Sequence, residues 1–579
     1  MAVGLTSFRP PIRGTNHMVS CGNPLAATAG FRILEQGGNA IDAGVASGIA
    51  INVTLPQAAN FGGVAPIILY DAASDQVVVI SGLGRFPKAA TIDYFKKHHG
   101  GDLPVGILRS VVSAAPDAWM TALERYGTMT FEQVVAPAVE LAEKGFPTGP
   151  RFTAGLERRE KIWRQWPQNV DLLAPRGYVH QPGEVFVQKD LANSLRRLAE
   201  VEGANAKKGR EAAIRAARDY FYKGEMAEEI VGFCQDQGGL MTMEDWSGFS
   251  VGIEAPQSGQ YKNYTIYTCG PWCQGPLLAE TLQMLEDDDL QALGHNSADY
   301  LHLVNQALAL SFSDRHHYYG DPDLVDVPIE GLLSKEYTRE RRAAIDMDRA
   351  FPEMPPPGSP WEYQGPTSAR PTSSPQPSTG GDLPDDTSYT CVVDRWGNAF
   401  SATPSDWFTA TPVIPGLGFI ASMRGEQIWL DPDHPSGLQP GKRPRLTPNP
   451  ALAFKDGKPF MAFGAPGGDA QCQAMAQVFL NIVEFGMDPQ AAIEAPRMTG
   501  WNFPNSFWPH QYLPGQVTVE GRIGSEVIEG LRKRGHDIQA TEDWIERMAG
   551  GPCAIQIDHE RGVLMAGADP RYDSYAIGR

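Results

Sequence analysis

Apolar and small residues recur with a helical period near the start of the chain. The stretch NPLAATAGFRILEQGGNAIDAGVASGIAINV predicts two helices in series, the first capped by Asn23 and ended by Gly37-Gly38. Asn39 caps the second helix, with Asp42 three residues later. The face of this second helix is small and apolar, so we expect it to pack closely against another element. Strand-like runs follow at APIILY and QVVVIS, separated by the turn residues DAASD.

Helical patterns then dominate to about residue 345, and regular patterning stops between Met354 and Asp386. This segment is rich in Pro, Ser, Thr and Gly, which predicts a flexible tail or a linker. From Thr387 onward the chain changes to the strand patterns SYTCVVD, NAFSATP and PFMAFGAP, with one amphipathic helix in DAQCQAMAQVFLNIVEFG. The residues after Thr387 contain only one predicted long helix, which is too little to form a separate hydrophobic core with these strands. We therefore expect these strands to complete a sheet that begins in the first part of the chain.

The composition narrows the class of protein. The chain has 579 residues, 42% hydrophobic and 20% charged, which is typical of two globular domains or one large multilayer domain. A net charge of −19 without a basic stripe argues against nucleic acid or an anionic membrane as partner. We find no apolar run long enough to predict a membrane span, and no apolar core of a signal peptide at the N-terminus.

The number and spacing of the cysteines indicate the redox environment of the protein. Seven scattered cysteines form neither a CxxC pair nor a disulfide framework, which fits a reducing cytoplasm. Cys234, Cys391 and Cys472 are predicted to be small core residues.

Thr387 is the first candidate for chemistry, because it stands where the Pro/Ser-rich segment changes into a strand. Cleavage before it would leave a hydroxyl nucleophile and a free α-amine on one residue. Such an amine has a pKa of about 7.7–8.0, so part of it is neutral near neutral pH and accepts the hydroxyl proton. The flexible acidic segment would present the Asp386 carbonyl to the Thr387 hydroxyl for self-cleavage. On local sequence alone, an ordinary threonine that opens a strand is the alternative.

The run GAPGGDAQ, residues 464–471, is the second candidate. It follows a predicted strand and opens a predicted helix. Successive glycine amides at a helix N-terminus can hold a phosphate or a developing oxyanion. The Gly-Lys-Ser/Thr ending of a phosphate-binding loop does not follow, and a plain strand–helix turn is the alternative.

The pair His316-His317 invites a metal hypothesis that the spacing does not favour. Adjacent side chains on a helix point about 100° apart, and no His-x-x-x-His or Cys cluster accompanies the pair. We therefore predict a solvated helix end. A G-x-S-x-G nucleophile elbow is also missing, so a Ser-His-Asp hydrolase of that type has no anchor in the sequence.

These signals occur in the order and spacing of one family. The chain resembles γ-glutamyltranspeptidases, members of the N-terminal nucleophile hydrolase superfamily, from MVSCGNPLAATAGFRILEQGGNAIDA to the terminal GADPRYDSYAIGR. Other matching blocks are FYKGEMAEEIV with GGLMTMEDW, SADYLHLVNQALALSFSDRHHYYGDPD and TPNPALAFKDGKPFMAFGAPGG. The resemblance covers nearly the whole chain.

The resemblance implies a fold and a processing event. It predicts an α+β fold, the four-layer αββα sandwich of N-terminal nucleophile hydrolases, formed by two subunits as one intertwined domain. The precursor would cleave itself between Asp386 and Thr387. The products would be a large subunit, 1–386, with the flexible tail 354–386, and a small subunit, 387–579.

The resemblance also implies roles for individual residues. The run TSYTCVVDRWGN places Thr387 at the nucleophile position. The oxyanion hole of the family matches Gly467 and Gly468, in agreement with the helix-terminus argument. A hydroxyl residue that supports the nucleophile matches Ser405 in the run TPSDWF.

Departures from the family pattern concern the substrate pocket. The arginine that holds the substrate α-carboxylate aligns with Leu83 in SGLGRFPKAAT, and Arg85 lies two residues away on the same face of an extended segment. The stretch that grips the α-amino group becomes SMRGEQ, in which Gln427 replaces the acidic anchor and Arg424 enters the pocket. The serine pair that contacts the carboxylate becomes Leu-Thr, ending at Thr447. Neighbouring residues complete the predicted pocket: Asp406, Trp407 and Asn449.

A pocket that loses an acidic anchor and gains a cation disfavours a zwitterionic glutamyl head. It prefers an amide that carries a carboxylate without an α-ammonium. Cephalosporin (glutaryl) acylases and oxamate amidohydrolase, in the same family, share this kind of drift, and the run GKRPRLTPNP resembles theirs.

The resemblance therefore predicts a cytoplasmic, self-processing amidohydrolase or acyltransferase that cleaves an amide of a small carboxylate-bearing substrate through an acyl-threonine intermediate. It implies no metal or organic cofactor. The expected partners are the amide substrate, the two subunits of one precursor, and a second heterodimer. Two alternatives stay open: an authentic γ-glutamyl transferase or glutathione hydrolase of glutathione metabolism, and a non-catalytic binding member of the family.

Overall fold

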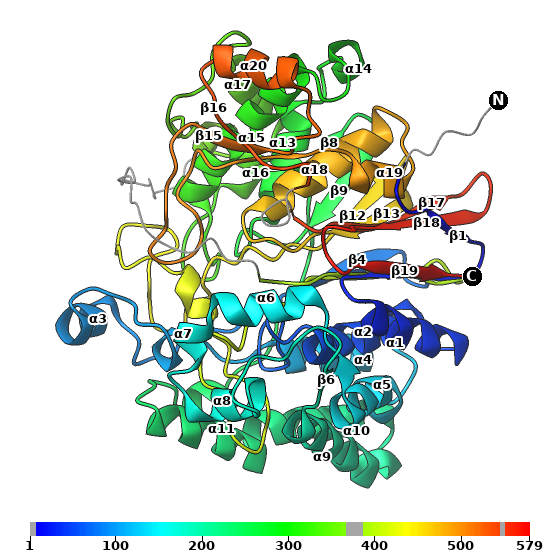
Figure 1. Ribbon diagram of the computed structural model, residues 1–579, viewed down its shortest axis with the longest axis vertical. Helices are drawn as coiled ribbons and strands as arrows, with labels where there is room; N and C mark the ends of the chain where they lie inside the picture. Colours follow the sequence, from blue (N-terminus) through cyan, green and yellow to red (C-terminus); the bar gives the residue numbers. More distant parts are fainter. Residues whose placement is uncertain (1–6, 366–385, 545–549) are drawn as a thin grey trace.

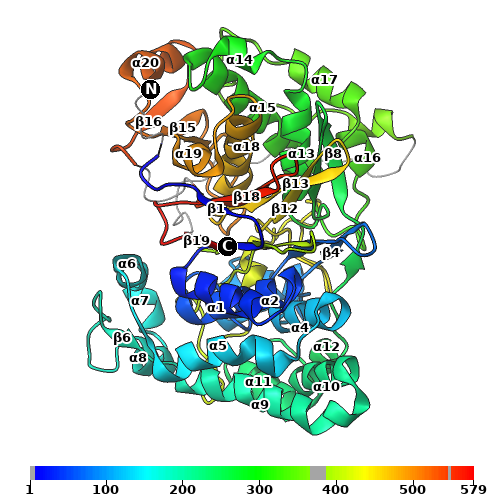
Figure 2. The same cartoon turned by 90° about the vertical axis from the view of Figure 1, so that its right-hand side faces the viewer.

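Two seven-stranded sheets lie face to face at the centre of the molecule, and helices cover the outer face of each (Figure 1). The computed structural model describes residues 7–365, 386–544 and 550–579. The view turned by 90° shows the same four layers, with α1 and α2 below the sheets and α15 and α18 above them (Figure 2). This arrangement confirms the predicted αββα sandwich.

Both sheets are antiparallel throughout, and both contain strands from the two sides of Thr387. The first sheet has the order β1 (Ile12–Gly14), β18 (Val563–Ala568), β17 (Cys553–Asp558), β13 (Lys458–Gly464), β12 (Ala451–Lys455), β9 (Tyr264–Thr268) and β8 (Gln257–Tyr261). The second has the order β19 (Tyr575–Gly578), β2 (Met18–Cys21), β10 (Thr390–Val393), β11 (Ala399–Ala402), β3 (Ile67–Asp71), β4 (Gln76–Ile80) and β7 (Ile253–Glu254). The β10–β11 hairpin therefore lies between β2 and β3.

Helices lie below the second sheet: α1 (Pro24–Glu35), α2 (Ala40–Thr54), α4 (Ala115–Tyr126), α5 (Phe131–Lys144), α9 (Lys189–Asn205), α10 (Arg210–Lys223) and α11 (Glu225–Asp236). Of these, α1, α2 and α4 contact the strands, and α9, α10 and α11 pack on other helices. Helices cover the first sheet from above: α13 (Gly275–Met284), α15 (Ala298–Tyr318), α17 (Lys335–Ala343), α18 (Ala470–Val483), α19 (Pro489–Glu494) and α20 (Ser525–Lys533).

Shorter elements complete the chain. The helices are α3 (Ile92–His99), α6 (Pro150–Arg158), α7 (Glu160–Trp163), α8 (Pro167–Leu173), α12 (Met243–Ser247), α14 (Leu290–Leu293) and α16 (Ile329–Leu332), with 3-10 turns η1 (Ile107–Arg109), η2 (Ala206–Lys208), η3 (Pro360–Tyr363) and η4 (Arg424–Gln427). The remaining strands are β14 (Met498–Gly500), β15 (Gln516–Val519) and β16 (Asp537–Ala540) in one small sheet, and β5 (Phe146–Pro147) with β6 (Val185–Phe186) in another.

Helix α2 is completely buried, and its sequence explains how. The Asn39 side chain accepts hydrogen bonds from the first turn while Asp42 accepts from the Asn39 N–H, which is the predicted cap. All 15 residues are buried. A Cβ added at Gly44 would come within 2.2 Å of the Phe400 ring, so small residues let this helix lie directly against the hairpin strand β11.

Three apolar layers separate the four structural layers. Val392 of β10 packs into the layer below the second sheet, while its neighbours Cys391 and Val393 pack between the two sheets. Successive side chains of a strand point to opposite faces, so a strand buried on both faces reads as a continuous apolar run. This burial explains the run SYTCVVD and confirms that the strands after Thr387 join a sheet begun earlier in the chain.

The prediction for His316-His317 was wrong. Both imidazoles are buried, because α15 is a central helix packed on all sides rather than a helix with a solvated end. His316 lies against Trp429 and His434, at ring-centroid distances of 5.1 and 4.8 Å. Within the described ranges, no group of three or more His, Cys, Asp or Glu side chains is arranged to hold a metal ion.

Two further predictions have partial outcomes. The seven cysteines are buried, as predicted for Cys234, Cys391 and Cys472. The Pro/Ser-rich segment lies mostly outside the described residues, and its described beginning contains the short turn η3. No helix among the described residues is both long enough and apolar enough to span a bilayer.

Candidate active site

Thr387 lies where the chain enters the central sheet, three residues before β10 begins. Its backbone N–H donates to the Ala58 carbonyl at 2.7 Å, and the residue is almost completely buried. Its φ of +82° is rare for a β-branched residue, which strains the backbone at this peptide unit.

Ser405 lies directly beside Thr387, as the resemblance implies. The two hydroxyl oxygens are 2.7 Å apart, and the Ser405 hydroxyl donates to an Asp386 carboxylate oxygen at 2.9 Å. The Arg424 guanidinium also donates to the Ser405 oxygen, at 2.6 Å. Since the single Ser405 proton goes to Asp386, Thr387 must be the donor in its bond to Ser405. The hydroxyl proton of Thr387 is thus directed along a short path to a carboxylate.

Arg424 is the centre of a group of charges that we name the Arg424 cluster: Asp386, Asp406, Arg424 and Glu426. The buried guanidinium bonds to Asp386 through Nη2, lies 3.3 Å from Asp406 through Nε, and lies 3.9 Å from Glu426 through Nη1. One cation therefore faces three carboxylates in a volume that excludes water.

Two aromatic rings flank the same guanidinium. The Trp407 and Phe507 ring centroids lie 5.7 and 5.9 Å from the Arg424 Cζ, and the two rings stack 6.0 Å apart. The Trp407 indole N–H is buried and has no hydrogen-bond partner among the described residues. The cluster thus combines a fixed cation with an apolar wall.

Burial raises the pKa values of two carboxyl groups in this cluster. Burial raises the pKa of Asp406 to about 6, although Arg424 and the Ser422 hydroxyl act in the opposite direction. Burial raises the pKa of Glu426 to about 7, against the charges of Arg109 and Arg424. Burial alone would lower the pKa of Arg424, but the charges of the three carboxylates outweigh it and the pKa is raised.

Arg109 is a functional candidate that sequence reasoning missed. Its Nη1 donates to Glu426 at 3.3 Å, while Nε and Nη2 hold the Leu103 carbonyl at 3.1 and 2.8 Å. Glu426 thus joins Arg109 to Arg424. The one available signal was a charged residue inside the apolar run ILRSVV. The partner is 317 positions away in the sequence, so local pattern could not reveal the pair.

Gly467 and Gly468 form the turn between β13 and α18. Their φ angles are +114° and +57°, a conformation that favours glycine at both positions. Both residues are buried, and none of the hydrogen bonds among the described residues uses their N–H groups. The α18 dipole adds partial positive charge at this end. Two buried N–H groups at a helix N-terminus are suited to bind an anion, and the oxyanion-hole role of Gly467 and Gly468 stays a prediction.

Gln274 links this turn to the predicted pocket and was also missed. Its Nε2 donates to the carbonyls of Thr447 and Gly468, at 2.9 and 3.0 Å. The Thr447 hydroxyl in turn accepts from Gln427 Nε2 at 3.0 Å, and Gln427 belongs to the same 3-10 turn as Arg424. The side chain of Asn449 faces Cys472 at the start of α18 instead of Arg424.

Arg85 does not join the Arg424 cluster by any contact described. Its guanidinium is one-third exposed and pairs with Asp321, at 3.1 Å, and with Asp323. Leu83, which aligns with the family's carboxylate-binding arginine, is an apolar residue buried between the two sheets. A role of Arg85 in substrate binding thus stays a prediction without support from its contacts.

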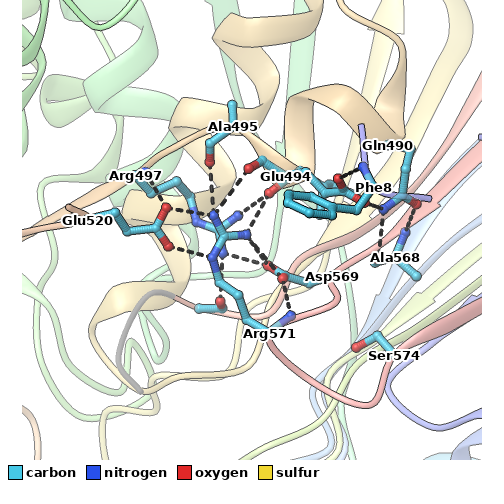
Figure 3. Close-up of polar contacts among 12 residues, drawn as sticks. Phe8, Gln490, Glu494, Ala495, Arg497, Glu520, Ala568, Asp569, Arg571 and Ser574 are labelled. Atoms are coloured by element: carbon cyan, nitrogen blue, oxygen red, sulfur yellow. Dashed lines mark hydrogen bonds and ion pairs between the residues drawn. The ribbon is translucent and has the colours of Figure 1, made fainter. Parts of the chain in front are cut away.

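A second buried ionic group lies behind the glycine turn, and we name it the Arg571 network: Arg497, Glu520, Asp569 and Arg571 (Figure 3). Arg571 bonds to Glu520 at 2.6 and 2.9 Å and to Asp569 at 3.1 Å, while Arg497 bonds to Asp569 at 2.5 Å. Arg497 also donates to the Gly550 carbonyl at 3.0 Å. Gly550 packs on the turn formed by Gly467 and Gly468, since a Cβ added at Gly467 would lie 3.0 Å from the Gly550 Cα.

The surroundings of Thr387 indicate a class of enzyme. A buried threonine hydroxyl where the chain enters an antiparallel sheet, bonded to a serine and with no histidine among its partners in the described residues, is suited to nucleophilic attack by an N-terminal residue. The αββα sandwich that carries it is the fold of N-terminal nucleophile hydrolases.

The chain belongs to the γ-glutamyltranspeptidase family, whose sequence profile, Gamma-glutamyltranspeptidase, matches residues 26–579. It is 33% identical over 569 residues to the glutathione hydrolase-like YwrD proenzyme of Bacillus subtilis (strain 168), covering 98% of this chain and 99% of that one. It is 31% identical over 587 residues to the acylase ACY 1 proenzyme of Pseudomonas sp. (strain V22), covering 99% and 95%. The crystal structure of cephalosporin acylase from Bacillus halodurans superposes with a TM-score of 0.85 at 29% identity, covering 100% of this chain and 98% of that one.

These similarities confirm the predicted family and fold class. They also confirm the predicted enzyme class, an N-terminal threonine hydrolase that acts as an amide hydrolase or acyltransferase.

Proposed function

We propose that this chain is the precursor of an amidohydrolase that cleaves itself between Asp386 and Thr387 and then acts on an amide of a small carboxylate-bearing acid. The observation that carries the proposal is the hydrogen-bonded path Thr387–Ser405–Asp386. The N–H groups of Gly467 and Gly468, which have no partner among the described residues, are the proposed oxyanion donors.

Self-cleavage would use the path as follows. The Thr387 hydroxyl oxygen attacks the Asp386 carbonyl carbon, and its proton passes through Ser405 to the Asp386 carboxylate. The C–N bond to Thr387 breaks, and the nitrogen takes that proton to become the α-amine. The ester between Asp386 and Thr387 is then hydrolysed by water. The strained φ of Thr387 favours bond breaking, because cleavage releases it.

Turnover would use the α-amine that cleavage creates. The amine accepts the Thr387 hydroxyl proton while the oxygen attacks the substrate amide, and the Gly467 and Gly468 amides stabilise the oxyanion. The amide C–N bond breaks, and the leaving amine departs with the proton. Water then hydrolyses the acyl-threonine and regenerates the hydroxyl, or an acceptor amine takes the acyl group.

The proposed pocket follows from the same contacts. Arg424, Asp406 and Trp407 contact one another next to the nucleophile and are proposed to hold the substrate. Thr447 and Asn449 shape its wall, between Gln427 and the start of α18. The large subunit 1–386 and the small subunit 387–579 remain one intertwined unit, because strands of both share each sheet. A cytoplasmic location and a dimer of these heterodimers complete the proposal.

Trapping of the covalent intermediate tests this function. The purified, aged protein is incubated with p-nitroanilides of small acids, and the small subunit is analysed by intact mass and peptide mapping. We expect release of p-nitroaniline and an acyl adduct on Thr387. Strong stimulation by glycylglycine with γ-glutamyl-p-nitroanilide would favour the γ-glutamyl transferase alternative. Release of p-nitroaniline without an adduct on Thr387 would contradict the mechanism.

A further inference from the structure

The Asp386 side chain occupies a binding site that self-cleavage vacates. The carboxylate is completely buried, and one of its oxygens accepts from both Arg424 and Ser405. Asp386 is also the last residue of the proposed large subunit. After cleavage it is a chain end attached to the segment 354–386, so nothing covalent holds it against Arg424.

When Asp386 leaves after cleavage, Nη2 of the buried Arg424 guanidinium loses its carboxylate partner. Arg424 is 0% exposed, and its Nη2 bonds to Asp386 and Ser405. Asp406 and Glu426 lie at the other nitrogens, and Nε and Nη1 have no hydrogen-bond partner of good geometry among the described residues. A buried cation is costly unless it is both paired and hydrogen-bonded, so the vacated edge should take up another carboxylate.

The chemistry of Asp386 defines the spacing that this carboxylate needs. In self-cleavage the Asp386 carbonyl is the group that Thr387 attacks, and its carboxylate is separated from that carbonyl by two carbons. A four-carbon dicarboxylic acid, attached as an amide at one end, has the same spacing. The site that fits the enzyme's own acyl group therefore fits a succinyl-like acyl group.

We propose that the substrates are half-amides of four-carbon dicarboxylic acids, with the free carboxylate of the acyl group taking the place of Asp386 on Arg424. This inference rests on the proposed function and specifies its acyl group. The buried guanidinium of Arg424 bonds to a carboxylate through Nη2, and the Trp407 N–H beside it, which has no hydrogen-bond partner among the described residues, offers a further donor.

The same geometry disfavours a γ-glutamyl group. That group has one more carbon between its carbonyl and its carboxylate. Its α-ammonium is attached to the carbon that bears the carboxylate, so it would lie beside the Arg424 cation. Like charges in a buried site are costly, and this repulsion discriminates between the two acyl groups.

Matched p-nitroanilides test the acyl group. Succinyl and butyryl derivatives have the same chain length and differ by the carboxylate; glutaryl, γ-glutamyl and α-aspartyl derivatives vary spacing and charge. We expect kcat/KM for the succinyl derivative to exceed that for the butyryl derivative by about 100-fold or more. Equal values for these two, or a γ-glutamyl derivative that is hydrolysed best, would overturn the inference. Loss of all turnover and of the Thr387 adduct would instead overturn the proposed function.

A variant pair and a binding measurement separate Arg424 from general effects. Arg424→Lys keeps the charge but loses the paired donors, so the succinyl preference should fall about tenfold or more. Arg218→Lys is the matched control, because Arg218 pairs with buried Asp117 in the α10 layer; its preference should not change. By calorimetry, succinate should bind the mature enzyme and not the uncleaved Thr387→Ala precursor, in which Asp386 still occupies the site. Equal binding of succinate to both forms would contradict the proposal that Asp386 occupies the site of the substrate carboxylate.

Discussion

The Arg424 cluster and the Arg571 network are both buried ionic groups, yet they differ in charge balance and in how completely their polar atoms are hydrogen-bonded. In the Arg571 network two arginines meet two carboxylates, and no polar side-chain atom of its four members is without a hydrogen bond. In the Arg424 cluster one central arginine meets three carboxylates. Every member has a buried polar atom that makes no hydrogen bond to the described residues: Asp386 Oδ1, Asp406 Oδ1, Arg424 Nε and Nη1, and Glu426 Oε1.

The difference in charge balance and hydrogen bonding suits the Arg571 network to stabilising the fold and the Arg424 cluster to binding and chemistry. A balanced, fully bonded buried network holds segments together, and the Arg571 network joins the end of α19, the turn after β15 and the end of β18. It lowers the pKa of Asp569 despite burial, through the charges of Arg571 and Arg497. An unbalanced cluster costs stability, and proteins keep such clusters where the imbalance is used in binding or chemistry.

Replacement of the two central arginines should show the largest contrast. Arg571→Gln leaves Glu520 and Asp569 buried without their main partner, so the free energy of unfolding should fall by about 3–5 kcal/mol. Arg424→Gln in the Thr387→Ala background should cost far less, because Asp406 and Glu426 already have raised pKa values and can be protonated. Denaturant unfolding of the uncleaved forms measures both. A larger loss in the Arg424 variant would reverse the comparison.

The glycine turn between the two regions provides the next test. Gly467→Ala requires a φ of +114° from a residue with a Cβ, and that Cβ would lie 3.0 Å from the Gly550 Cα. We expect the oxyanion donors to be displaced and kcat to fall by about 10²–10³-fold, with little change in KM. Gly486→Ala is the control, since Gly486 also has a positive φ but open space around it. Equal losses of kcat in the two variants would point to backbone strain alone.

The pH dependence of stability gives the smallest expected effect. The pKa values of Asp406 and Glu426 are raised to about 6 and about 7 in the folded precursor. Between pH 4 and 7 the folded state therefore binds more protons than the unfolded state, and stability falls as pH rises. Glu426→Gln in the Thr387→Ala precursor should remove on the order of 2 kcal/mol of this dependence. An unchanged slope would show that Glu426 titrates normally.

The two regions also differ in how far the sequence predicts them. Local signals raised Thr387, Gly467 and Gly468 as candidates: a change of pattern, and glycines between a strand and a helix. The family resemblance then favoured their catalytic roles over an ordinary threonine and a plain turn. The role of Ser405 came from the family resemblance and that of Arg424 from a departure from it. The structure places both beside Thr387, and their roles stay predictions. The link from Glu426 to Arg109 could not be deduced, because these two residues are 317 positions apart and meet only in the folded chain.

Long-range contacts also explain why the surroundings of other residues differ from what their local sequence indicates. His316 was placed at a solvated helix end because its own helix has a mixed sequence, whereas burial is decided by Trp429 and His434 from the other side of Thr387. Arg85 was placed in the pocket by its position in an extended run, but Asp321 and Asp323 determine where its guanidinium lies. The Arg571 network, with members from three separate segments of the chain, left no local signal.

The central claim is that cleavage before Thr387 turns the Arg424 cluster into an active site. The most direct test is the intact mass of the purified protein after prolonged incubation, beside the Thr387→Ala variant. We predict two fragments for the wild type, with the small one beginning at Thr387, and a single chain for the variant. A folded wild type that stays uncleaved, or a small fragment that begins at another residue, would contradict the account.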